Sequence, residues 1–92
     1  MKKVFRIVDE YGAHARPLEK LVNYFGNFQS EINVMFGYQV VNGKSILYLM
    51  SLALKKDDVF TIDAKGVDEK EVFEGLKAFN QSLNTPLFVN VD

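Results

Sequence analysis

The stretch Gly12-Ala13-His14-Ala15-Arg16-Pro17 lies between a segment with the pattern of a strand and a segment with the pattern of a helix. It contains the only histidine of the 92-residue chain. Gly12 tolerates a backbone conformation with positive φ, and the fixed φ of Pro17 suits the first turn of a helix. The stretch therefore predicts a tight turn that brings His14 to the amino-terminal end of a helix.

His14 and Arg16 together have the chemistry of an anion site. Imidazole is the one side chain that ordinarily titrates near neutral pH, so it offers a neutral, nucleophilic nitrogen. The planar guanidinium of Arg16 matches a phosphate or a carboxylate. Free N–H groups and the dipole at a helix start favour an incoming negative charge. We predict a site that takes up and hands on a negatively charged group, phosphoryl above all.

The apolar residues on either side of this stretch predict an α+β fold. They recur with period two in four segments and with helical spacing in three. The predicted strands are residues 2–8, 31–36, 38–41 and 59–64, and the predicted helices follow Pro17, Ser45 and Asp68. The order β-α-β-β-α-β-α predicts an open-faced two-layer sandwich, in which three helices cover one face of a four-stranded antiparallel sheet.

Ser45 and Asp68 are predicted helix N-caps, because their side-chain oxygens can accept hydrogen bonds from free amides. Glu71, three residues after Asp68, completes the pattern of a capping box. On the helix after Ser45, Leu47 and Tyr48 are predicted to point largely away from the core. The predicted core-facing stripe of that helix is Ile46, Leu49, Met50 and Ala53.

Composition predicts one folded domain over residues 1–92. A net charge of -1 provides no basic field for nucleic acid or an anionic membrane. One histidine and no cysteine exclude disulfides and disfavour a metal site, and we expect no cofactor. No apolar run reaches the length of a signal peptide or a membrane span, so we expect no membrane insertion and a cytoplasmic protein.

Residues 84–92 form a short apolar C-terminal extension that includes Leu87, Phe88, Val89 and Val91. Such a segment can pack as a strand-like arm, mediate association, or fray. The sequence does not choose among these three behaviours.

Two motifs resemble a known family. Gly12-Ala13-His14-Ala15-Arg16-Pro17 resembles the active-site signature of HPr, the histidine-containing phosphocarrier of the bacterial phosphoenolpyruvate:sugar phosphotransferase system. Val41-Asn42-Gly43-Lys44-Ser45-Ile46-Leu47, followed by Met50-Ser51-Leu52, resembles the regulatory serine of that family and the short helix behind it. Asp68-Glu69, before the last predicted helix, also matches the pattern of this family. The similarity runs from about Lys3 to Leu83, with the order and spacing of the elements kept.

The resemblance implies that His14 accepts a phosphoryl group at Nδ1 from phosphorylated enzyme I and passes it to sugar-specific components. Arg16 would steady that group. Ser45 matches the serine that an ATP-dependent HPr kinase modifies in Gram-positive relatives, which creates a partner for a transcriptional regulator. The protein would then be a monomeric phosphocarrier and a substrate of its partner enzymes, not an enzyme itself.

The chain departs from the family pattern at four positions. Leu18 and Glu19 follow the proline where small residues or threonine are usual, and a carboxylate near His14 would repel phosphoryl unless it pairs with Arg16 or caps the helix. Gly43 replaces a bulky apolar residue and Tyr48 replaces a glycine. We predict an exposed apolar docking patch for partner proteins beside His14, formed by Leu18, Leu47 and Tyr48.

Three other functions are weighed against the carrier. The first is a divergent HPr-like protein that acts in regulation through Ser45, because Glu19 has prevented or redirected phosphoryl transfer through His14. A non-catalytic assembly module would use the extension 84–92 and not His14. An acylphosphatase-like hydrolase is disfavoured, because the chain lacks a glycine-rich loop with an arginine at the first turn.

Overall fold

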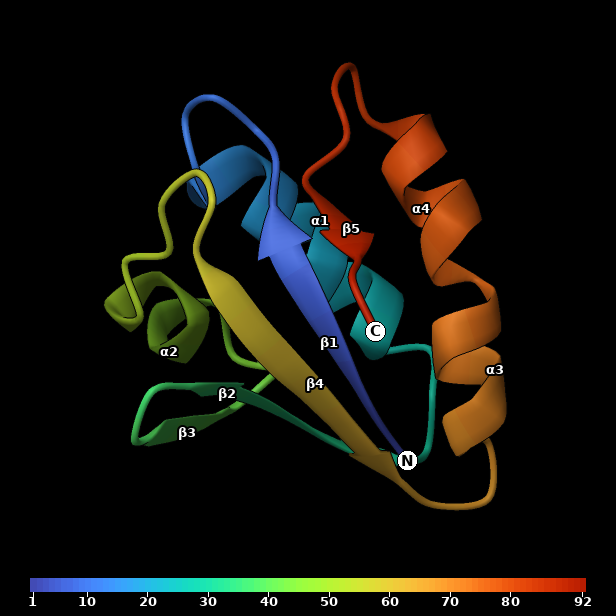
Figure 1. Ribbon diagram of the computed structural model, residues 1–92. Coiled ribbons are helices and arrows are strands. Elements are labelled where there is room, and N and C mark those ends of the chain that lie inside the picture. Colours follow the sequence, from blue (N-terminus) through green and yellow to red (C-terminus); the bar gives the residue numbers. More distant parts are fainter.

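In the computed structural model, which describes all of residues 1–92, helices cover one face of an antiparallel sheet (Figure 1). The strand order is β3-β2-β4-β1-β5. The strands are β1 (Lys2–Ile7), β2 (Glu31–Phe36), β3 (Gln39–Asn42), β4 (Val59–Lys65) and β5 (Phe88–Asn90). The helices are α1 (Ala15–Phe25), α2 (Ile46–Ser51), α3 (Glu69–Glu74) and α4 (Leu76–Ser82).

The core lies between the inner sheet face and the helices. Residues of alternate strand positions meet there, with Phe5 of β1 opposite Phe60 of β4, and Val34 of β2 opposite Ile62 of β4. Burial of these side chains supplies the main driving force for folding. No helix combines the length and the apolar composition that crossing a membrane requires.

The predicted final helix is divided at Gly75 into α3 and α4, which lie in line along one side of the molecule (Figure 1). The division occurs where Tyr24 of α1 approaches. Its hydroxyl donates a hydrogen bond to the carbonyl of Val72, and a Cβ on Gly75 would lie 2.5 Å from that hydroxyl. Burial of Tyr24 raises the pKa of its hydroxyl. The single helix predicted after Asp68 is therefore two short helices that accommodate one tyrosine.

The sheet has a fifth strand, where the sequence predicts four. Residues 84–92, called here the C-terminal arm, return along β1 so that Ile7 pairs with Phe88 and Phe5 with Asn90. Leu87 and Phe88 are buried. Of the three behaviours open to this segment, the structure has the strand-like one, because two apolar side chains complete the core at the edge of β1.

The core-facing stripe predicted for α2 is wrong at two positions. Met50 and Ala53 are exposed, and Ala53 has a φ of 51°. The helix ends at Ser51, so the chain turns after it and Leu52 and Leu54 enter the core in their place.

Asp68 stands at the N-cap position of α3, but its side chain does not cap that helix. Its carboxylate instead accepts hydrogen bonds from the amides of Gln29 (2.8 Å) and Ser30 (2.9 Å) and from the Ser30 hydroxyl. These bonds, the one from the Ser30 hydroxyl most of all, lower the pKa of Asp68. Asp68 therefore does not form the predicted capping box. It forms a tie, a set of hydrogen bonds that connects the start of α3 to the residues just before β2.

This tie predicts a pH-dependent stability. Because the folded-state pKa of Asp68 lies below its ordinary value of 3.8, the ionised carboxylate stabilises the fold above that pH, and the contribution is lost as pH falls through the folded-state pKa. We expect Asp68→Asn to lower the thermal midpoint at pH 7, with the deficit shrinking below pH 3.8. Glu71→Gln on the same helix should leave the midpoint unchanged. A deficit of Asp68→Asn that does not vary with pH would contradict this account.

Candidate functional site

The turn before α1 is fixed by contacts with the segment after α2. Gly12 has a φ of 72°, and a Cβ at this position would lie 2.6 Å from the carbonyl oxygen of Leu54. That oxygen accepts a hydrogen bond from the amide of Ala13 (2.9 Å). Only glycine fits both the backbone conformation and the close approach. The predicted tight turn is confirmed, and it holds His14 at the start of the helix.

His14 is the N-cap residue of α1, with extended backbone and a side chain that makes no capping hydrogen bond. The side chain is 44% exposed. The amides of Ala15 and Arg16 donate no hydrogen bond, and Pro17 has no amide hydrogen. The helix start therefore keeps two free donors, and the positive end of the helix dipole, next to the imidazole.

Asp9 is a site residue that the sequence analysis missed. Its carboxylate is only 7% exposed, and Oδ2 lies 3.3 Å from Nε2 of His14. Its Oδ1 accepts a hydrogen bond from the amide of Tyr11 (2.8 Å). An ionised carboxylate can only accept, so we assign the hydrogen to Nε2, which leaves the lone pair of the neutral imidazole on Nδ1. Residues 9–12 carry only the pattern of a turn, and no sequence spacing identifies the contact.

A hollow of about 230 Å³ lies beside the imidazole and is called here the His14 hollow. Arg16 and Lys20, one helical turn apart on α1, both line it, and neither forms an ion pair. Tyr11 stands edge-on to the imidazole, with the ring centroids 6.2 Å apart. Residues 83–85, where α4 gives way to the C-terminal arm, also line the hollow. The hollow thus combines one nucleophilic nitrogen with two unpaired cations.

The structure corrects the prediction for Leu18. Its side chain is 2% exposed, because it lies on the buried face of α1 with Leu21 and Phe25. It therefore cannot belong to an exposed patch. Leu47 and Tyr48 are exposed on α2, as predicted. Glu19 is exposed, does not line the His14 hollow and forms no ion pair with Arg16.

Ser45 caps α2 as predicted, since its hydroxyl accepts a hydrogen bond from the amide of Tyr48 (3.4 Å). It does not line the His14 hollow. The neighbouring Gly43 is enclosed, because a Cβ there would lie 3.0 Å from Cγ2 of Ile32 and 3.2 Å from Phe25. A bulky side chain at position 43 would have to displace the core. No group of three or more His, Asp or Glu side chains is placed to hold a metal ion.

Comparison with known proteins agrees with this geometry. A family model described as the PTS HPr component phosphorylation site matches residues 1–82. Phosphocarrier protein HPr of Lysinibacillus sphaericus is 43% identical over 72 residues, which cover 78% of this chain and 82% of that protein. Two solved structures are also similar: the histidine-containing phosphocarrier protein of a Mycoplasma (TM-score 0.82, 30% identity, covering 89% of this chain and 93% of that chain) and HPr of Bacillus anthracis (TM-score 0.79, 32% identity, covering 86% and 94%). The chain therefore belongs to the HPr family of phosphocarrier proteins.

Proposed function

We propose that the protein accepts a phosphoryl group on Nδ1 of His14 from phosphorylated enzyme I and passes it to sugar-specific components of the phosphotransferase system. The observation that carries this proposal is the pairing of Nε2 with Asp9, because it leaves Nδ1 as the nitrogen with a free lone pair. The family membership supports the same assignment. The proposed setting is the cytoplasm, and the protein acts as a monomer that is a substrate of its partner enzymes.

The transfer is an in-line displacement at phosphorus. The lone pair of Nδ1 forms the new N–P bond while the bond between phosphorus and the donor's leaving atom breaks, and its electrons stay with the donor. The hydrogen remains on Nε2, and the positive charge that the ring acquires lies 3.3 Å from the carboxylate of Asp9. Arg16, Lys20 and the free amides of the helix start balance the charge on the phosphoryl oxygens. Transfer to the acceptor reverses these steps.

Partner proteins are proposed to contact the exposed side chains of Leu47 and Tyr48 on α2. Both are large apolar groups without a partner in the isolated chain. Large apolar and aromatic side chains supply most of the binding energy at protein interfaces. Leu18 no longer contributes to this proposed surface.

The test of the function is phosphoryl transfer to the native chain. We expect incubation with phosphoenolpyruvate and a bacterial enzyme I to add one phosphate that is labile in acid and stable in alkali. Phosphorus–nitrogen couplings in the NMR spectrum should place it on Nδ1 of His14. No phosphate under conditions that saturate another HPr protein, or phosphate on Nε2, would overturn the proposal.

Asp9 is expected to matter for the rate. Hydrogen bonds to charged groups contribute about 1.5–3 kcal/mol, so losing the one that supports the charged ring should lower kcat/KM for phosphoryl acceptance by about 10- to 100-fold. We therefore expect this loss in Asp9→Ala, whereas Glu10→Gln, which changes an exposed neighbour, should behave as native. Nitrogen-15 shifts of His14 should also show the Nδ1–H tautomer gaining population in Asp9→Ala. An unchanged tautomer with a slower rate would assign Asp9 a purely structural role.

Ser45 is proposed as a second, regulatory phosphorylation site. Its hydroxyl already lies at a helix N-cap, where an added phosphate meets free amides and a favourable dipole. The partners would be an ATP-dependent HPr kinase and a transcriptional regulator. With ATP and such a kinase, we expect His14→Ala to be labelled and Ser45→Ala not. Labelling of Ser45→Ala would move the site elsewhere.

A further inference from the structure

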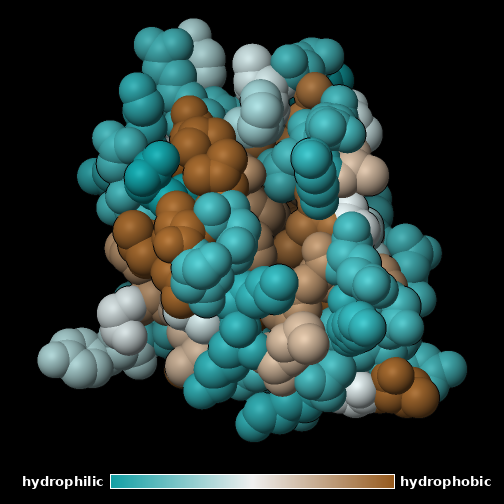
Figure 2. All heavy atoms as spheres, turned by 45° about the vertical axis from the view of Figure 1, so that its right-hand side comes forward, coloured by the Kyte–Doolittle hydropathy of each residue, from teal (hydrophilic) through white to brown (hydrophobic).

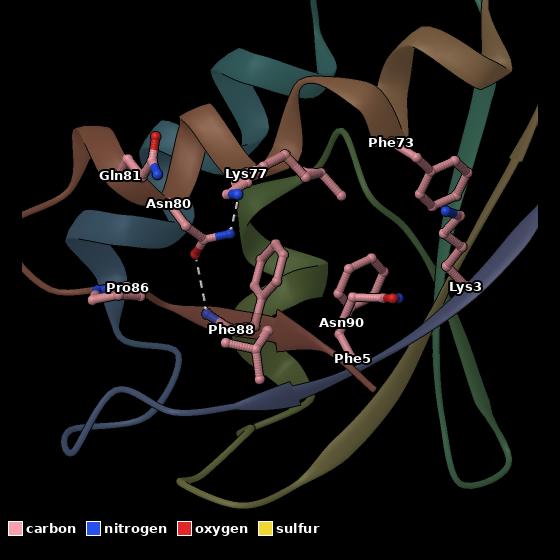
Figure 3. Close-up of a pocket in the computed structure, with 11 residues that line it drawn as sticks. Lys3, Phe5, Phe73, Lys77, Asn80, Gln81, Pro86, Phe88 and Asn90 are labelled. Atoms are coloured by element: carbon pink, nitrogen blue, oxygen red, sulfur yellow. Dashed lines mark hydrogen bonds between the residues drawn. The ribbon is translucent and has the colours of Figure 1, made fainter. Parts of the chain in front are cut away.

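A second hollow, of about 400 Å³, lies between the C-terminal arm, β1 and the helices α3 and α4 (Figure 3). It is called here the arm hollow and shares no lining residue with the His14 hollow. The rings of Phe5 and Phe88 rise from the strands towards the helices, and Phe73 stands on the helix side (Figure 3). On the face that brings α3 and α4 forward, apolar atoms are visible in a furrow between hydrophilic ridges (Figure 2).

The wall of the arm hollow is held in place by Asn80. Its Oδ1 accepts hydrogen bonds from the amides of Leu87 (2.9 Å) and Phe88 (3.1 Å), and its Nδ2 donates to the carbonyl of Leu76 (3.0 Å). The two bonds that Oδ1 accepts fix the arm against α4, and the bond that Nδ2 donates holds the side chain on its own helix. The hollow is therefore formed before any ligand arrives, which lowers the entropy cost of binding.

The two charged side chains that line the arm hollow are both positive. Lys3 and Lys77 line it, and no acidic side chain does, although the whole chain has a net charge of -1. Neither lysine forms an ion pair. Nζ of Lys3 lies 5.9 Å from the centroid of the Phe73 ring. An aromatic floor with two unpaired cations at its rim is complementary to a ligand with an apolar ring and a negative charge.

Asp92 limits the charge that such a ligand can carry. Its carboxylate accepts a hydrogen bond (2.8 Å) from Asn90, which lines the arm hollow. That bond is the main cause that lowers the pKa of Asp92, and the charge of Lys3 makes the smallest contribution. A second negative charge beside Lys3 must share that lysine. A singly charged group is therefore favoured over a doubly charged one.

We propose that the arm hollow binds a small aromatic carboxylate. The ring system would lie over the parts of Phe5, Phe73 and Phe88 that reach the floor of the hollow, and the carboxylate would lie between Lys3 and Lys77. A volume of about 400 Å³ holds a ligand of one or two rings, at the lower end of small-molecule sites. Pro86, Phe88, Val89 and Asn90 of its wall lie beyond residues 1–82, which the family model matches, so the site belongs to this chain's own arm.

The test is a titration of the full-length, unphosphorylated protein with 1-naphthoate, followed by amide NMR. We expect saturable shift changes at Lys77, Phe88 and Val89 and none at His14. Replacing both rim lysines (Lys3→Gln with Lys77→Gln) should weaken binding about tenfold, which corresponds to about 1.4 kcal/mol. Lys55→Gln with Lys56→Gln removes the same number of charges from exposed positions outside the hollow, and this charge-matched control should bind as native.

Two further binding measurements separate the contribution of the ligand's charge from that of its ring. Asp92→Asn should strengthen binding, because it removes the competing carboxylate near Lys3, and the uncharged 1-naphthalenemethanol should bind more weakly than naphthoate. His14→Ala should bind naphthoate as the native chain does. A failure of ligand binding can therefore be distinguished from a failure of phosphoryl transfer. Shifts that do not saturate, or an affinity that is unchanged when both lysines are replaced, would overturn the proposal.

Discussion

Replacing His14 by alanine is expected to abolish acid-labile phosphorylation by enzyme I while the chain stays folded. The chain has no second histidine that could accept the group in its place. The side chain is 44% exposed and is bonded only to Asp9, so its removal takes nothing from the core. Transfer of labelled phosphate from phosphoenolpyruvate measures the first effect, and the urea unfolding midpoint measures the second.

Two neighbours serve as graded controls for this variant. Arg16→Ala and Lys20→Ala each remove one cation from the His14 hollow and leave the nucleophile, so transfer should slow without stopping. Each of these variants should still reach full labelling at long times. Acid-labile label on the His14→Ala chain would contradict the assignment of the nucleophile, whatever the behaviour of the two cation variants.

Replacing Phe88 by alanine is expected to destabilise the fold by about 3–5 kcal/mol, the usual cost of removing a buried phenylalanine. Phe88 is 2% exposed. Its ring meets Phe5 and Phe60 edge-on, with centroids 5.1 Å and 5.5 Å away. Because small domains are stable by only about 5–15 kcal/mol, this one change removes a large part of the total. Urea denaturation gives the free energy of unfolding.

The matched control is Val89→Ala, the next residue of the same strand. Val89 is 38% exposed, so its truncation should cost less than about 1 kcal/mol. The contrast between the two neighbours tests whether the arm completes the core. Equal, small effects at both positions would show that the arm is not part of the folded domain in solution.

Most of the fold follows from local sequence pattern. The alternation of Ile32, Val34 and Phe36 predicts β2 with its observed bounds, and Ser45 is correctly predicted as an N-cap. β5 could not be predicted in this way, because a strand of three residues is too short to display a period. Its pairing with β1 depends on the space left beside Phe5 and Phe60, which only the assembled core defines.

The candidate site was predictable for residues that are close together in the sequence. His14, Arg16 and the helix start lie in one stretch, and the geometry brings them together. Asp9 could not be assigned, because its approach to His14 depends on how the turn closes against Leu54. Lys20 was within reach of sequence reasoning, because it lies one helical turn after Arg16 on α1. Asp9 and Glu19 both lie five residues from His14 in the sequence, yet only the carboxylate of Asp9 lies next to the imidazole.

The place of β1 in the sheet has a consequence for biosynthesis. β1 is the first strand to leave the ribosome, but its two neighbours, β4 and β5, are made last among the strands. Residues 2–7 therefore wait unpaired during most of translation, exposed to chaperones and to other nascent chains. The His14 hollow also lacks one wall until residues 83–85 have emerged. The hollow is therefore complete only when nearly all of the chain has been synthesised.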